Sequence, residues 1–205
     1  AGDKAEACGN GTRCVAKILF DENSEKETLK IQSDAGTLIA KKAGNEISVN
    51  MGRMTTDWKK IPLSEEMDPL NIPITVEGFD RGVAVNIGNP HVVFFGKSIE
   101  NINLNQVGPK IEKHNFFPNK TNVEFIEILN SNTIKMKVWA RGAGVTLACG
   151  SGACAAVYAG WKKKLIESSA EVQLERGSLH INIINEEAIM TGPAEISYNG
   201  NIQIK

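Results

Sequence analysis

Short stretches of alternating hydrophobic and polar residues recur through the middle of the chain and predict β-strands. These stretches lie at residues 72–76, 83–87, 92–95, 123–128 and 134–138. A helix is expected over residues 104–115, where the sequence Phe-Phe-Pro-Asn that follows is expected to end it. Residues 67–73, with two prolines, are typical of a loop.

Two further segments have the hydrophobic pattern of helices that are enclosed by sheet. Residues 14–20 are hydrophobic on almost every side of the expected helix. In the second segment the residues that recur at helical spacing are Cys154, Val157, Tyr158, Trp161 and Leu165. Free cysteine is among the most buried residue types, so Cys14 and Cys154 are expected to pack in the core.

Each of these helices follows a Cys-Gly-x-Gly sequence, which begins at Cys8 in the first case and at Cys149 in the second. The similarity continues downstream, where glycines stand at matching distances: Gly36 and Gly52 after Cys8, Gly177 and Gly192 after Cys149. The first glycine of each pair separates two alternating segments, as in a hairpin. The sequence therefore predicts a duplicated unit consisting of a loop, a helix and about three strands.

The duplication and the predicted elements indicate an α+β protein with two pseudo-symmetric domains. In each domain a mixed or antiparallel sheet is expected to wrap around a central helix. The expected domains are residues 1–47 with 195–205, including a strand near 196–204, and residues 48–194. A length of 205 residues is compatible with two small domains.

Composition and charge exclude several classes of protein. The chain has 23 Lys and Arg against 24 Asp and Glu, so no basic field is available to attract nucleic acid. The longest hydrophobic run, near residues 91–95, is too short to cross a membrane. Four cysteines without a secretory signal favour free thiols and a cytoplasmic location, and their spacing does not fit zinc knuckles, so no metal site is expected.

The positions of Cys8 and Cys149 point to acid–base chemistry. Each precedes the first turn of an expected helix, where unpaired N–H groups and the helix dipole stabilise a thiolate or a bound carboxylate. If the two domains face each other, one thiolate can remove a proton from a carbon atom while the other thiol returns a proton to the opposite face. Such a two-base device needs no pyridoxal phosphate, and the two thiols would titrate as a coupled pair.

Four sequence segments carry a resemblance to a known family: CGNGTRC at 8–14, GNPH at 88–91, TNVEF at 121–125 and RGAGVTLACGSGACA at 141–155. In order and context they resemble the motifs of diaminopimelate epimerase, over residues 1–194. The resemblance implies cofactor-independent conversion of LL- to meso-diaminopimelate, on the route to lysine and peptidoglycan. It also implies a homodimer.

The same resemblance implies roles for individual residues. Cys8 and Cys149 would be the acid and base, conventionally proton donor and acceptor in the LL-to-meso direction. His91 would modulate the two thiols. The residues that would contact the substrate are Gly9, Asn10, Asn89, Asn122, Arg141, Gly150 and Ser151. A guanidinium such as that of Arg141 suits a substrate with two carboxylates, because it binds a carboxylate through two hydrogen bonds.

The chain departs from the family pattern in two places. Ala140 stands where the family has a glutamate that contacts the substrate, so weaker binding and slower turnover are expected. The stretch before Cys8 is also several dozen residues shorter than the stretch between Gly52 and Cys149. The first domain is therefore expected to lack its opening segment, to expose strand edges and to associate.

Three alternatives stay open at this stage. A related racemase, such as one acting on proline or hydroxyproline, could share the scaffold. The chain could also be a catalytically weak or silent member of the fold. Finally, two facing thiols could oxidise to a disulfide, which would inactivate the enzyme.

Overall fold

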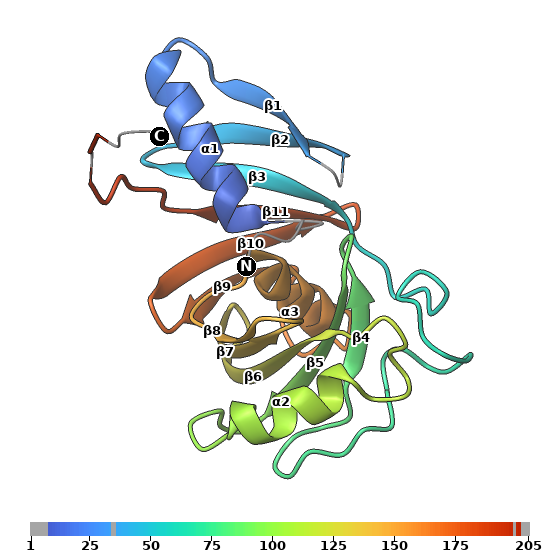
Figure 1. The fold of residues 1–205 in the computed structure, drawn as a ribbon. Coiled ribbons are helices and arrows are strands. Elements are labelled where there is room, and N and C mark those ends of the chain that lie inside the picture. The colour runs from blue at the N-terminus through green and yellow to red at the C-terminus, as the bar shows by residue number, and fades with distance from the viewer. Residues whose placement is uncertain (1–7, 34–35, 199, 202–205) are drawn as a thin grey trace.

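The structure is a computed structural model that describes residues 8–33, 36–198 and 200–201 (Figure 1). Within these ranges eleven strands form one sheet, in the order β1-β2-β3-β11-β10-β9-β7-β6-β5-β4, with β8 paired to β7. Helix α1 lies on the upper part of the sheet in Figure 1, whereas α3 lies inside the curve of the lower part. The fold is of the α+β class.

The first unit consists of α1 (Gly9–Glu22), β1 (Thr28–Ser33), β2 (Gly36–Ala43) and β3 (Glu46–Arg53). The three strands pair antiparallel, and α1 packs against all of them. Buried and half-exposed side chains alternate along β3, which places one face of the strand against the core.

The second unit consists of α3 (Gly150–Lys162), β9 (Ser169–Leu174), β10 (Gly177–Ile184) and β11 (Glu187–Gly192). Each of these four elements begins 141 residues after its counterpart in the first unit. Strands β3 and β11 pair antiparallel, so the two units join edge to edge in one sheet. The duplication predicted from the glycine spacing is therefore confirmed, while the domain boundaries at 47/48 and 194/195 stay a prediction.

The segment between the two units extends the sheet around α3. Its elements are β4 (Val83–Asn86), β5 (Pro90–Gly96), α2 (Leu104–Glu112), β6 (Asn122–Asn130), β7 (Thr133–Ala140) and β8 (Gly144–Thr146). Strands β5 and β6 pair parallel, as do β7 and β9. Helix α2 packs on the opposite side of β6 and β7, over a second core cluster that includes Phe94 and Phe125.

The strands expected at 83–87, 92–95, 123–128 and 134–138 are confirmed as β4, β5, β6 and β7. The strand expected at 72–76 is wrong, because Ile72 makes only an isolated bridge to Gly82 and Pro73 has no N–H for a ladder. Its hydrophobic side chains are nevertheless buried. The expected helix 104–115 ends early, at Glu112, where the N–H of His114 turns back to the carbonyl of Ile111.

Near the C-terminus, the expected strand at 196–204 is wrong for residues 196–198 and 200–201, which are irregular, and its remaining positions lie outside the described residues. The core assignment is confirmed for Cys154, which is fully buried, but it is wrong for Cys14, which is exposed. Val15 and Ile18 are 46% and 52% exposed on the same helix, because the strands of the described ranges cover the other face of α1. No helix among the described residues has the length and hydrophobicity to cross a membrane.

Candidate active site

The N-terminal ends of α1 and α3 meet at the junction of the two units. Cys8 and Cys149 are the N-cap residues of these helices. A Cβ atom added to Gly150 would lie 3.5 Å from the Cα of Gly9, and 2.9 Å from the sulfur of Met190. Glycine at these positions therefore lets the two helix starts approach each other, and with them the two cysteines.

Cys149 is half-buried and held by its own helix. Its sulfur accepts a hydrogen bond from the N–H of Gly152 at 3.3 Å and lies 3.5 Å from the hydroxyl of Ser151. Burial raises the pKa of the Cys149 thiol, and the negative charge of Glu124 raises it further. The two hydrogen bonds act in the opposite direction, and a smaller contribution that raises the pKa comes from Cys8, which is close enough to interact electrostatically.

Cys8 is exposed, in contrast to Cys149. Its carbonyl oxygen accepts hydrogen bonds from the backbone and side chain of Thr12, at 2.9 and 3.0 Å. Beside it, the side-chain oxygen of Asn10 is buried and has no hydrogen-bond partner among the described residues. An unpaired buried acceptor is costly, so this oxygen is a candidate contact for an ammonium group of a ligand.

His91 lies in a buried chain of hydrogen bonds below the helix starts. Its Nδ1 is 2.7 Å from Oε1 of Glu124, and its Nε2 is 3.0 Å from Oδ1 of Asn89. The side chains of His91 and Glu124 are fully buried. Strands β5 and β6 bring these residues together, because His91, on β5, and Glu124, on β6, both point toward α3.

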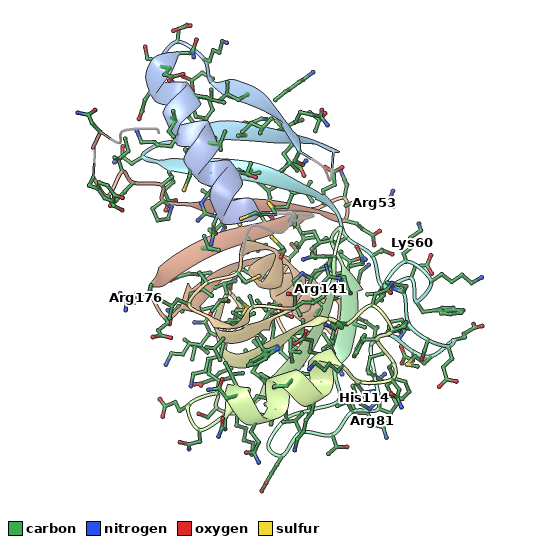
Figure 2. The ribbon with its side chains drawn as sticks, in the orientation of Figure 1. Arg53, Lys60, Arg81, His114, Arg141 and Arg176 are labelled. Atoms are coloured by element: carbon green, nitrogen blue, oxygen red, sulfur yellow. The ribbon has the colours of Figure 1, made fainter. Side chains whose placement is uncertain are left out.

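Asn122 connects two backbone segments near the same site. Its amide nitrogen donates to the carbonyl of Pro90 at 2.9 Å, and its side-chain oxygen accepts from the N–H of Arg141 at 2.9 Å. The guanidinium of Arg141 donates to the carbonyl of Asn119 at 3.3 Å. Figure 2 shows Arg141 near the middle of the view, whereas Arg176 lies at its edge.

A family profile described as diaminopimelate epimerase matches residues 83–197. The diaminopimelate epimerase of Pelagibacter ubique is 41% identical over 99% of this chain and 76% of its own length. That of Carboxydothermus hydrogenoformans is 45% identical over 97% of this chain and 74% of its own length. The chain belongs to the diaminopimelate epimerase family.

Solved structures with lower sequence identity share the fold. A phenazine biosynthesis protein of the PhzF family from Enterococcus faecalis has a TM-score of 0.66 and 17% identity, over 98% of this chain and 74% of that one. A hydroxyproline epimerase from Agrobacterium vitis has a TM-score of 0.63 and 14% identity, over 92% of this chain and 65% of that one. At these sequence identities the similarity shows that this diaminopimelate epimerase-family chain shares their fold, and nothing more.

Three further residues of this family member shape the site beyond those predicted from the sequence. Glu112, which is buried on α2, accepts from the indole N–H of Trp139 at 2.7 Å and from the N–H of Gly142 at 3.2 Å. It therefore holds the turn that carries Arg141. Arg13 is buried and donates to the carbonyl of Pro193 and to the sulfur of Met190, each at 3.3 Å, which ties α1 to the second unit.

The third such residue is Glu124, which acts on both His91 and Cys149. Its sequence signal was a carboxylate between two hydrophobic residues of a predicted strand, a position where charged residues are rarely buried without a partner. The structure thus brings together Cys8, Cys149 and the glycines beside them, and separately links His91 to Asn89 and Asn122 to Arg141. All four cysteines are free thiols in this structure.

Proposed function

We propose that this chain is a cofactor-independent epimerase that interconverts LL- and meso-diaminopimelate with Cys8 and Cys149 as its two acid–base residues. The observation that carries the proposal is the convergence of two cysteine N-caps, supplied by helices at equivalent positions of a duplicated unit. Membership of the diaminopimelate epimerase family supports the choice of substrate.

In the proposed reaction one thiolate takes the proton from the α-carbon, forming an S–H bond as the C–H bond breaks. The other thiol then donates its proton to the opposite face of the carbon, which inverts the configuration. The unpaired N–H groups of the two helix starts, at Gly9–Asn10 and Gly150–Ser151, would hold the α-carboxylate and stabilise the negative charge of the carbanion-like transition state. After each turnover the two sulfurs have exchanged protonation states.

The remaining polar residues would bind the rest of the substrate. Asn10 offers a buried oxygen without a partner among the described residues, suited to an ammonium group. The guanidinium of Arg141 suits the distal carboxylate, with Asn89 and Asn122 as further contacts. His91, which lies beside Glu124, would modulate the acidity of the two thiols. A cytoplasmic location and a homodimeric assembly complete the proposal.

Deuterium exchange at the α-carbon of diaminopimelate in D2O tests the proposal directly. Cys8→Ser and Cys149→Ser are each expected to lower stereoinversion by about 10²- to 10⁴-fold, the usual contribution of a general acid or base. Cys14→Ser is the matched control, because Cys14 is an exposed cysteine on α1. Full epimerase activity in Cys149→Ser would exclude the two-base mechanism, and no exchange in the unsubstituted chain would exclude the activity.

Ala140→Glu tests the departure from the family pattern. Ala140 ends β7, directly before Arg141, and its methyl group cannot accept a hydrogen bond. Restoring the glutamate is expected to raise kcat/KM for diaminopimelate by about tenfold, because it adds one charge-assisted hydrogen bond to the substrate. Ala140→Gln is the control without the charge. If neither variant turns over faster than the unsubstituted chain, the alanine does not limit the reaction.

A further inference from the structure

Glu124 is a carboxylate on a strand that is otherwise hydrophobic at its start. Val123 and Phe125 point to the α2 side of β6, whereas Glu124 and Ile126 point to the α3 side. Glu124 is fully buried, and its second oxygen, Oε2, has no hydrogen-bond partner among the described residues. A half-satisfied buried carboxylate is costly for stability, so its retention calls for a reason other than packing.

The other oxygen of Glu124 lies directly beneath the first turn of α3. A Cβ atom added to Gly152 would come within 2.7 Å of Oε1 of Glu124 and 3.3 Å of the sulfur of Cys149. The glycine therefore leaves room for the carboxylate at the turn where the N–H of Gly152 itself donates to the Cys149 sulfur. In the same position Oε1 accepts the hydrogen bond from Nδ1 of His91.

The titratable groups that face Cys149 come from four elements. Glu124 on β6, Cys8 at the start of α1 and Cys154 on α3 interact with it directly, and His91 on β5 reaches it through its contact with Glu124. Burial is the main reason why the pKa of Cys149 is raised, and Glu124 is the largest charged contributor. Among the described residues, Glu124 is the carboxylate that raises the pKa of this thiol.

We propose that Glu124 is a positioning residue for the reaction, whose buried carboxylate fixes the ring of His91 through Nδ1 and places a negative charge beside the turn that holds the sulfur of Cys149. A carboxylate only accepts hydrogen bonds, so the contact places a ring proton on Nδ1, and Nε2 faces the side-chain amide of Asn89, which can donate to it through its NH2 group. The inference rests on the proposed function for its role in catalysis, but its chemical basis can be tested without substrate.

Alkylation of the thiols by iodoacetamide, followed residue by residue with mass spectrometry, is the first test. In the unsubstituted chain the rate at Cys149 is expected to keep rising with pH beyond 9.0, the ordinary pKa of a thiol, because burial raises the pKa of Cys149 and only the thiolate reacts. Reaction of Cys149 that is already independent of pH near neutrality would overturn the proposal. This measurement needs no variant, so it stands whether or not the substituted chains fold.

Glu124→Gln supplies the second test. The substitution keeps the shape and an acceptor for His91 but removes the charge, so alkylation of Cys149 at neutral pH is expected to become about tenfold faster. The matched control is Glu127→Gln, on the same strand but the opposite face, where the carboxylate accepts from the backbone N–H of Ile99 at 3.2 Å. Equal rates at Cys149 in the two variants would overturn the role of Glu124.

The pH profile of kcat/KM connects this effect to catalysis. Loss of the Glu124 charge is expected to move the limb that reports Cys149 to lower pH, whereas a purely structural effect would lower the whole profile without moving it. If alkylation of Cys149 becomes faster but this limb of the pH profile does not move, Glu124 affects the thiol in the absence of substrate only, and its role in the reaction is overturned. If the unsubstituted chain does not epimerise diaminopimelate, the proposed function fails, while the alkylation result still decides the state of Cys149.

Discussion

Helices α1 and α3 occupy equivalent positions in the two units, yet their surroundings differ. Cys14, Val15 and Ile18 of α1 are exposed. The residues 141 positions later on α3, Ala155, Ala156 and Ala159, are fully buried. Small residues allow strands to enclose α3 on this face, whereas the same face of α1 carries larger side chains that are exposed.

The difference follows from the strands that surround each helix. Helix α3 packs against β4, β5 and β6 in addition to the strands of its own unit, whereas α1 packs against β1, β2 and β3. The chain spans 76% and 74% of the length of two relatives, so these relatives contain further residues. The described part of the chain leaves one face of α1 uncovered, and the side chains on it are hydrophobic.

A second difference concerns the position after the first helical turn. Arg13 in α1 corresponds to Cys154 in α3, and both side chains are buried. Burial lowers the pKa of Arg13, and it raises that of Cys154, because burial disfavours the charged form of either group. The guanidinium of Arg13 donates hydrogen bonds to the carbonyl of Pro193 and the sulfur of Met190, and it therefore links α1 to the second unit. The duplicated unit thus keeps its backbone while its two interiors diverge.

Exchanging the side chains of Ile18 and Ala159 gives the largest expected effect. Ala159→Ile adds bulk at a fully buried position and is expected to lower the free energy of unfolding by about 1–3 kcal/mol. Ile18→Ala, at a position 52% exposed, is expected to change it by less than about 0.5 kcal/mol. Urea unfolding of both variants measures the contrast. A loss of about 2 kcal/mol in Ile18→Ala would mean that this face of α1 is covered in solution.

Gly11 and Gly152 allow the same comparison at the helix starts, with a smaller effect. A Cβ at Gly152 would press on Oε1 of Glu124, so Gly152→Ala is expected to cost about 1 kcal/mol of stability and to lower epimerisation. Among the described residues, a Cβ at Gly11 would meet the Cys8 side chain alone, at 3.2 Å, so Gly11→Ala is expected to be neutral or stabilising through helix propensity. Thermal unfolding of the two variants measures the difference in stability. Changes of equal sign and size in Gly152→Ala and Gly11→Ala would show that the two helix starts do not differ in this way.

The repeat could be predicted from the sequence because it depends on local backbone requirements. Gly36 and Gly177 have φ values of +116° and +137°, which favour glycine. A glycine therefore stands at the equivalent position of both hairpins and can be recognised in the sequence. The strands from 83 to 138 were predictable for a similar reason, since each has a hydrophobic face. Cys8 and Cys149 could be predicted at helix starts because each begins a Cys-Gly-x-Gly sequence that precedes a helical pattern.

The environment of each helix could not be predicted in the same way. A hydrophobic pattern shows which side chains can be buried, but not which strands cover them. For this reason the sequence predicts a core position for both Cys14 and Cys154, although Cys14 is exposed. The link between His91 and Glu124 joins residues 33 positions apart on parallel strands, so no local pattern reveals it. The hydrophobic residues of 72–76 are buried without forming a ladder, because burial and strand pairing are separate requirements.

The smallest expected difference lies between the turns that close β2–β3 and β10–β11. In the second, Glu186 accepts a hydrogen bond from Lys162 at 2.6 Å, which lowers the pKa of Glu186, whereas the equivalent residue in the first turn is the uncharged Asn45. A lowered pKa stabilises the fold above the unfolded value of 4.5, and this contribution is lost as the pH falls through the folded value. Between pH 7 and 3 the unsubstituted chain should therefore lose about 0.5 kcal/mol more than Glu186→Gln, since the pair is solvent-exposed. Asn45→Gln is the control, and an identical acid dependence of urea unfolding in all three chains would show that the pair contributes nothing.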